Sequence, residues 1–150
     1  MHDIHQLREE IKGILDLQKL SVLATQGDGR PYGSLVAFAA TADLKTLLFA
    51  TKRATRKYSN LLAHPDVAMV IDTRTNQAAD FSDATAVTAL GEVEEVAADD
   101  RQEFLNIYIE KHPYLKEFVE SPTCALLRVR VRNYIMVSRF QNVQELHVSE

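Results

Sequence analysis

Residues 19–51 read KLSVLATQGDGRPYGSLVAFAATADLKTLLFAT. Three apolar segments are separated there only by short polar turns. Gly27 and Gly29 are free to take positive φ and Pro31 stops a helix, so GDGRP predicts a hairpin turn. Strands joined by such short turns pair antiparallel, because a parallel crossover needs about a dozen residues or more. The stretch therefore predicts antiparallel strands at 19–26, 32–41 and 46–51.

The rest of the chain continues this pattern. Apolar or alternating runs predict further strands at 66–73, 84–97 and 143–148, and two strands within 124–140 joined by a tight turn near Asn133. Helical spacing or helix-start signals predict helices at 2–18, 55–64, 99–112 and 113–120, with a polar loop at 75–83. Strands that follow one another without crossover helices favour a single domain, residues 1–150, built as an antiparallel barrel with helices on its rim.

Composition excludes several classes of function. The chain has 150 residues and a formal net charge of −4, which argues against general nucleic-acid binding and against docking on anionic membrane. A single cysteine, Cys124, excludes an internal disulfide and any cysteine-based zinc site. No run approaches the ~18 apolar residues of a membrane span, and the polar N-terminus lacks a signal-peptide core. We therefore expect a cytoplasmic protein.

A dense group of cations follows the third predicted strand. Residues 49–61, FATKRATRKYSNL, contain no carboxylate but hold Lys52, Arg53, Arg56 and Lys57. The cations lie at the start of the predicted helix that Thr55 would cap, where the helix dipole disfavours each of them by about 0.3–1 kcal/mol. Free backbone N–H groups and the hydroxyls of Thr51 and Thr55 add donors at the same point. Together these features predict a phosphate site.

Other interpretations of the cations stay open. Surface charge runs are often only solvated, and the same residues are compatible with a helix start that faces water. Nucleic acid is a weaker candidate, because the segment is short and the chain is acidic. The Walker pattern GxxxxGK[ST] and the dinucleotide pattern GxGxxG are both absent from the sequence.

In this context the sequence resembles the pyridoxamine 5′-phosphate oxidase-like FMN-binding split barrels. The similarity lies in the strand end FAT followed by Thr55-Arg56-Lys57, in the continuation YSNLLAHPDVAMVI, in GDGRPYGSLVAFA and in AVTALGEVEEV. It spans about residues 7 to 140. The resemblance implies a mainly β (α+β) fold, a six-stranded antiparallel split barrel with peripheral helices. It also implies a homodimer with one FMN in each of two clefts between the subunits.

The resemblance also assigns residues to the cofactor. Arg56 and Lys57 would hold the phosphate, and Thr51 and Thr55 would hydrogen-bond to it or to the ribityl chain. The backbone of residues 34–37 would run beside the isoalloxazine ring, and SLVAFA is small and apolar enough to form that wall. The predicted cofactor-binding residues are Ser34, Leu35, Val36, Ala37, Ala50, Thr51, Thr55, Arg56 and Lys57.

The sequence departs from true pyridoxamine phosphate oxidases. Those enzymes have an arginine at the position of Ser34, an aromatic residue at that of Ala50 and an Arg-Leu-His segment near the end, where this chain reads VQELHVSE. We therefore expect a flavin-dependent oxidoreductase with another substrate, without a catalytic side chain or a metal. One alternative is a non-catalytic module that binds flavin, haem or another phosphorylated ligand. Another is a structural barrel that has lost its ligand site.

Overall fold

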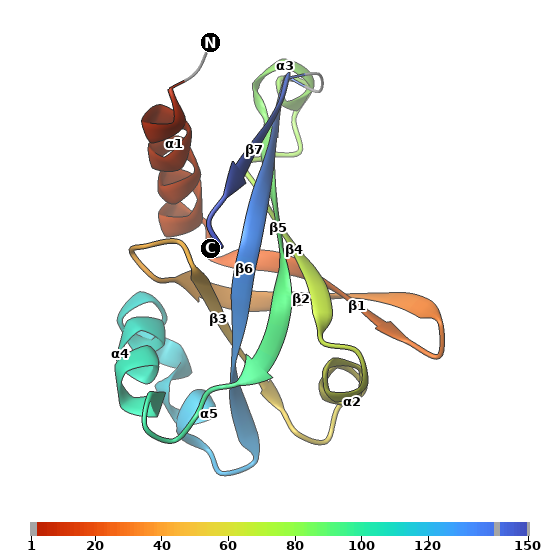
Figure 1. Cartoon of the computed structure of the whole chain (residues 1–150), viewed down its shortest axis with the longest axis vertical. Helices are drawn as coiled ribbons and strands as arrows, with labels where there is room; N and C mark the ends of the chain where they lie inside the picture. Colours follow the sequence, from red (N-terminus) through yellow and green to blue (C-terminus); the bar gives the residue numbers. More distant parts are fainter. Residues whose placement is uncertain (1–2, 140–141, 150) are drawn as a thin grey trace.

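The computed structural model describes residues 3–139 and 142–149. Its strands pair antiparallel throughout, in the order β3-β2-β1-β4-β5-β6-β7, and a further pairing of β3 with β6 closes the first six into a barrel (Figure 1). The predicted six-stranded antiparallel barrel is therefore confirmed. The strands are β1 (Leu20–Gly27), β2 (Arg30–Ala40), β3 (Thr46–Lys52), β4 (Asp66–Asp72), β5 (Thr85–Glu95), β6 (Cys124–Ser138) and β7 (Asn142–His147).

The prediction of two strands within 124–140 is wrong, because β6 is one strand of 15 residues. One edge of β6 pairs with β3 in its first half and with β7 in its second half, while the other edge pairs with β5. This continuous pairing leaves no room for a turn near Asn133. The register instead shifts at Leu90/Gly91, where Asn133 and Val131 are the partners, so Arg132 is the extra residue of a bulge.

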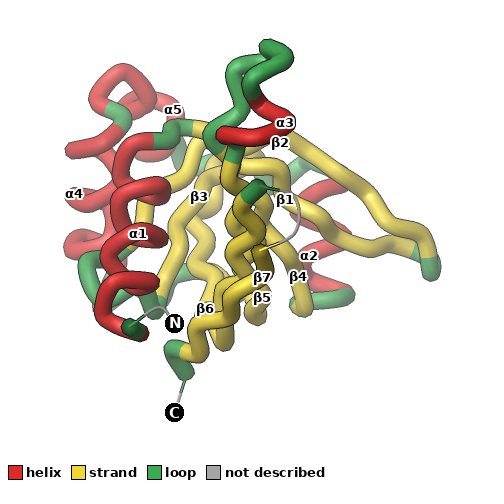
Figure 2. Tube along the Cα trace, turned by 90° about the horizontal axis from the view of Figure 1, so that it is seen from above, coloured by secondary structure: helices red, strands yellow, loops and turns green. Residues whose placement is uncertain are grey.

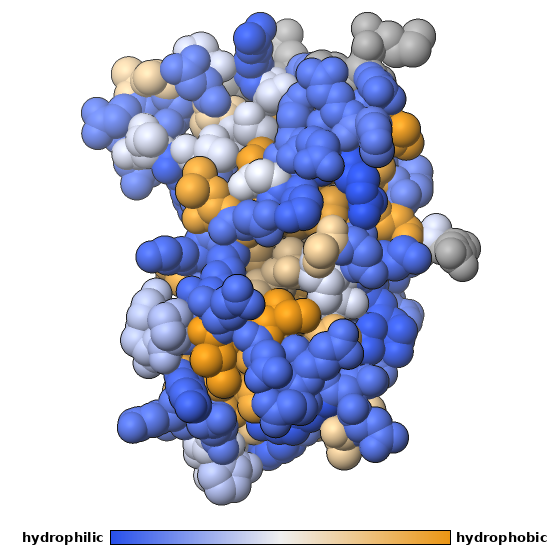
Figure 3. Space-filling model, turned by 90° about the vertical axis from the view of Figure 1, so that its left-hand side faces the viewer, coloured by the Kyte–Doolittle hydropathy of each residue, from blue (hydrophilic) through white to orange (hydrophobic). Residues whose placement is uncertain are grey.

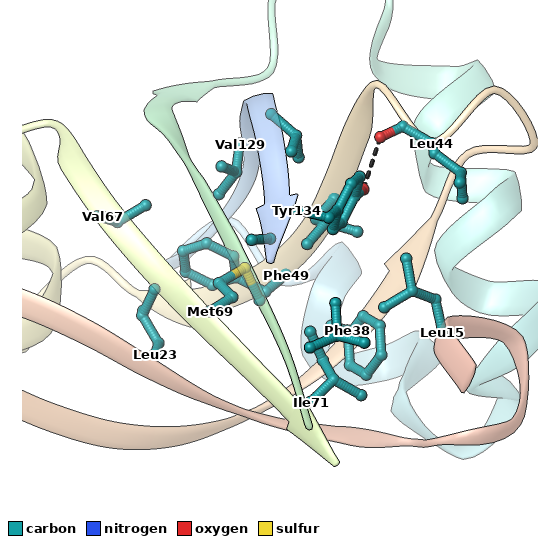
Figure 4. Packing of buried hydrophobic residues seen from close by; sticks show 14 of the residues in the cluster. Leu15, Leu23, Phe38, Leu44, Phe49, Val67, Met69, Ile71, Val129 and Tyr134 are labelled. Carbon is teal, nitrogen blue, oxygen red and sulfur yellow. Dashed lines mark hydrogen bonds between the residues drawn. The ribbon is translucent and has the colours of Figure 1, made fainter. Parts of the chain in front are cut away.

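Helices cover parts of this barrel. Helix α1 packs against it and contributes Leu7, Ile11 and Leu15 to the interior, where the hydroxyl of Tyr134 donates to the carbonyl of Leu44 at 2.6 Å (Figure 4). A second apolar cluster joins α4 and α5 to outward-facing residues of β2, β3 and β6. The helices are α1 (Ile4–Leu17), α2 (Arg56–Ala63), α3 (Asp80–Asp83), α4 (Arg101–Lys111) and α5 (Lys116–Glu120), with a 3₁₀ turn at Pro113–Leu115.

Two features of this arrangement shape the molecule outside its core. The segment predicted as a loop, 75–83, contains the single turn α3. The β1–β2 hairpin projects from the barrel on the side away from α4, with α2 beside it (Figure 2). No helix in the described part of the chain is long and apolar enough to cross a membrane.

Candidate functional site

The barrel is split between β2 and β3. These strands pair only where Phe38–Ala40 meets Leu47–Phe49, so residues 34–37 of β2 have no partner in β3. The N–H of Phe38 donates toward β1, to the carbonyl of Lys19 at 3.2 Å. Because backbone groups alternate in direction along a strand, the amide groups of Leu35 and Ala37 point into the split. An open strand edge therefore lies where the sequence predicts the wall for a flat ring.

The predicted wall residues face three directions. Val36 is buried in the barrel interior, and Ser34, two residues earlier, has a buried hydroxyl without a partner in the described structure. Leu35 points outward and is 61% exposed. Ala37 and Ala50 instead pack in the apolar cluster beneath α4 and α5. The exposed part of the wall is therefore the edge of β2 and the side chain of Leu35.

Tyr108 of α4 holds the inner end of this wall. Its hydroxyl donates to the carbonyl of Ala37 at 3.1 Å. Burial raises the pKa of Tyr108 well above its ordinary value, so the hydroxyl keeps its proton. Tyr108 was not among the residues predicted for the site, because helical spacing contains no information on a contact with β2.

Thr55 caps α2 as predicted. Its hydroxyl oxygen accepts a hydrogen bond from the N–H of Tyr58 at 3.1 Å, and its O–H donates to the carbonyl of Lys52 at 2.9 Å. The hydroxyl of Thr51 lies 3.3 Å from it. The hydroxyl proton of Thr55 is therefore already donated to the carbonyl of Lys52. The predicted hydrogen bond from Thr55 to a phosphate requires that the bond to Lys52 break. The N–H groups of Arg56 and Lys57 remain as the open donors of the helix start.

The four cations of residues 52–57 differ in whether they have a carboxylate partner. Arg53 donates two hydrogen bonds of 2.7 Å to the carboxylate of Glu95 and one of 3.1 Å to the hydroxyl of Tyr58. This guanidinium holds the pKa of Glu95 below its ordinary value. The carboxylate missing from the sequence around Arg53 thus comes from β5. Among residues 3–139 and 142–149, Lys52, Arg56 and Lys57 have no carboxylate partner.

Arg56 faces a cavity of about 570 Å³ between α2 and the β1–β2 hairpin. Its guanidinium lies 5.8 Å from the ring centroid of Tyr32. Helix and hairpin are in direct contact, because a Cβ added at Gly27 would lie 2.3 Å from Oδ1 of Asn60. Arg30 lines the same cavity and was not identified from the sequence, since it lies in the turn GDGRP. The other predicted phosphate ligands, Thr51, Thr55 and Lys57, do not line it.

Lys57 has a different environment from Arg56. Its side chain is half-buried, and burial lowers the pKa of its ammonium group below the ordinary value. A half-buried cation without a counter-ion is unfavourable in the free protein, so a bound anion would stabilise it. The arrangement thus matches a phosphate better than it matches a solvated helix start.

The sequence of the chain matches a known protein family. The sequence model of the pyridoxamine 5′-phosphate oxidase family matches residues 7–138. The chain belongs to this family. A comparison with curated proteins found no match.

Solved structures with this fold have low sequence identity to this chain. A heme binding protein from Mycobacterium smegmatis aligns with a TM-score of 0.85 and 15% identity, covering 99% of this chain and 59% of the other. General Stress Protein 26 from Bacillus anthracis aligns with a TM-score of 0.70 and 19% identity, covering 95% and 98%. A FAD-binding protein from Mesorhizobium loti aligns with a TM-score of 0.68 and 16% identity, covering 85% and 91%. At these identities the likeness shows the split-barrel fold alone.

The residues around the split and the start of α2 fit the two ends of a flavin mononucleotide. The start of α2 offers cations without a carboxylate partner among the described residues for a phosphate, and the open, partly apolar edge of β2 offers a wall for a ring. In the described part of the chain, no group of three or more His, Cys, Asp or Glu side chains could hold a metal ion. His147 of β7 is exposed, and its Nε2 lies 2.8 Å from a carboxylate oxygen of Glu145.

Proposed function

We propose that the protein binds FMN in the split of the barrel and acts as a flavin-dependent oxidoreductase. The observation that carries this proposal is the cationic start of α2, where Arg56 has no carboxylate partner among the described residues and faces Tyr32 of β2, the strand whose edge is open further along. Arg56 and Lys57 would hold the phosphate with their side chains and their free N–H groups. The backbone of Leu35 and Ala37 would hydrogen-bond to the ring. Bound FMN would supply the electron transfer, and the chain would supply binding and orientation.

The substrate is proposed to differ from that of true pyridoxamine phosphate oxidases. Ser34, at the position where those enzymes have an arginine, offers only a short side chain whose hydroxyl is buried. Ala50 packs under α4 and α5 instead of offering an aromatic face to the split. Both positions therefore lack the side chains that would recognise a phosphorylated pyridine.

The absorption spectrum of the purified protein tests this proposal. We expect the protein to be yellow as isolated or to become so when FMN is added, with one FMN per chain, and to be bleached anaerobically by NADH or NADPH. A protein that takes up FMN but is reduced by neither nucleotide would be a binding module or use another donor. A protein that remains colourless in excess FMN would refute the proposal.

The haem-binding relative supports a second candidate, a non-catalytic module that stores haem. Its fold matches 99% of this chain. Titration with hemin in the same spectrometer separates the two ligands, because a protein-bound haem gives an intense Soret band that flavin lacks. We expect FMN to bind more tightly, since Arg56 and the half-buried Lys57 have no carboxylate partner among the described residues and match its phosphate.

We also propose that the protein is a homodimer with FMN at the subunit interface. Strand register places one row of outward-facing residues across β2, β1, β4, β5 and β6. None of them is fully buried, and all except the threonine are apolar; they are Leu35, Val22, Val70, Thr88 and Ile135. A cavity of about 490 Å³ includes the first three of them. A second copy on this face would cover it and enclose the ring beside Leu35.

Ile135→Lys is expected to convert this dimer to a monomer and to weaken FMN binding at least about tenfold, because the interface would then bury a charge. Light scattering measures the mass, and fluorescence titration measures the affinity. Tyr114→Lys is the matched control, since Tyr114 is 71% exposed and lies outside the sheet face. A dimer that survives Ile135→Lys with unchanged affinity would place the interface elsewhere.

The affinity for FMN is expected to fall as pH rises from neutral into the alkaline range. Protonated Lys57 attracts the phosphate, and burial lowers the pKa of its ammonium group, so the charge is lost below the pH at which an ordinary lysine loses it. Titrations between pH 7 and 10 measure the slope. Lys57→Met should bind more weakly at pH 7 and show a flatter profile. Equal slopes for the two proteins would remove Lys57 from the phosphate site.

A further inference from the structure

A cavity of about 720 Å³ lies away from the split, between α4, the β2–β3 turn and the residues that follow β7. It lies among residues that no part of the proposed flavin site uses, since none of the predicted cofactor-binding residues lines it. Hydrophobic residues come to the surface between hydrophilic ones on the face that carries α1 and α4 (Figure 3). The apolar lining consists of Ala42, Phe104, Ile107, Val131 and Val148.

Arg128 of β6 lines the cavity and, unlike the neighbouring arginines of the strand, has no carboxylate partner among the described residues. Its Nη2 donates to the hydroxyl of Thr46 at 3.3 Å, and its guanidinium lies 4.9 Å from the ring centroid of Phe104. Its Nε is buried and has no partner, and no carboxylate of the described residues pairs with it. The neighbouring arginines of the same strand are different, because Arg130 pairs with Glu94 and Arg132 with Asp66.

The two carboxylates at the rim of the cavity, Asp43 and Glu103, do not pair with Arg128. Asp43 accepts from the hydroxyl of Thr41 at 2.6 Å and from the N–H of Lys45 at 2.9 Å, and these bonds lower its pKa. Glu103 is exposed in the first turn of α4, where the helix dipole stabilises a negative charge. A half-buried guanidinium that forms no ion pair with the described residues therefore faces the cavity.

We propose that this cavity binds an organic carboxylate with an apolar body. The carboxylate would pair with Arg128, whose Nη1 has no partner among the described residues, and the body would lie on Phe104, Ile107 and Val148. Arginine suits this role because its planar fork matches a carboxylate. The volume lies within the range of about 300–1,000 Å³ that small-molecule sites occupy.

Calorimetric titration with 2-naphthoate, compared with the neutral 2-naphthamide of similar shape, tests the proposal on the wild-type protein. We expect one 2-naphthoate per chain and at least about tenfold weaker binding of the amide, since a charge-assisted hydrogen bond distinguishes them. Arg128→Gln should bring the two affinities within about threefold of each other. Arg132→Gln, a control on the same strand outside the cavity, should preserve the difference.

A second measurement does not depend on a variant that folds. The buried Nε–H of Arg128 should exchange slowly with solvent and be visible by NMR, and its resonance should shift when 2-naphthoate is added. Saturation with FMN should leave the affinity for 2-naphthoate unchanged, which separates this site from the split. Equal affinity for both probes, no shift of the Arg128 resonance, or competition by FMN would each overturn the proposal.

Discussion

Replacing Arg56 with alanine is expected to weaken FMN binding by about tenfold to a hundredfold, because it removes a charge-assisted hydrogen bond worth about 1.5–3 kcal/mol. Arg56 has no carboxylate partner among the described residues and faces the cavity below the β1–β2 hairpin. Its charge is therefore available to a phosphate. Fluorescence titration of FMN measures the change, and a thermal melt checks that the variant is folded.

Arg53→Ala is the matched control for this experiment. Arg53 lies three residues away in the same cationic segment, but its guanidinium is occupied by Glu95 and Tyr58. Its removal should change the affinity for FMN less than about threefold and lower stability only slightly, as for other exposed pairs. If both substitutions weaken FMN equally, the segment acts as a diffuse positive field and Arg56 has no specific role.

The contrast between Arg53 and Arg56 marks the limit of the sequence as a guide to this site. Cation density predicted an anion site, but it could not distinguish a cation with a remote partner from one without. Glu95 is 42 residues from Arg53 in sequence, and only strand pairing in the barrel brings them together. The same holds for Arg30, which reaches the cavity of Arg56 because the hairpin folds onto α2.

Local signals were more reliable than long-range ones. The turn between β1 and β2 and the cap at Thr55 were predicted because glycine, proline and threonine act within a few residues. Closure of the barrel depends on β3 pairing with β6, whose first partners are Thr46 and Arg130, and periodicity contains no information on such a pairing. For closure, resemblance to a family was the informative signal.

The wrong prediction of two strands within residues 124–140 also results from long-range pairing. Asn133 favours a turn locally, but residues 127–138 find partners along β5 and the chain stays extended. Tertiary pairing overrides the local preference, since a turn would leave backbone groups of both β5 and β7 without partners. The bulge at Arg132 absorbs the misfit between the two strands.

Gly91→Ala is expected to destabilise the protein by about 2–3 kcal/mol, because the bulge brings the backbone of β6 against this glycine. A Cβ at Gly91 would lie 2.2 Å from the carbonyl oxygen of Arg130 and 2.9 Å from its carbonyl carbon. Backbone atoms held in the ladder cannot move aside as a flexible side chain would, so β5 and β6 must separate locally. Urea denaturation measures the free energy of unfolding.

The same substitution at Gly13 should have the opposite sign, which makes it the control. Gly13 is exposed within α1, and a Cβ there would meet nothing within 4 Å. Alanine is a better helix former than glycine, so Gly13→Ala should stabilise the protein by about 0.5–1 kcal/mol. If Gly91→Ala proved as stable as the wild type, β5 and β6 would have to pair without the close approach at Arg130, and the bulge would not be a fixed feature of the barrel.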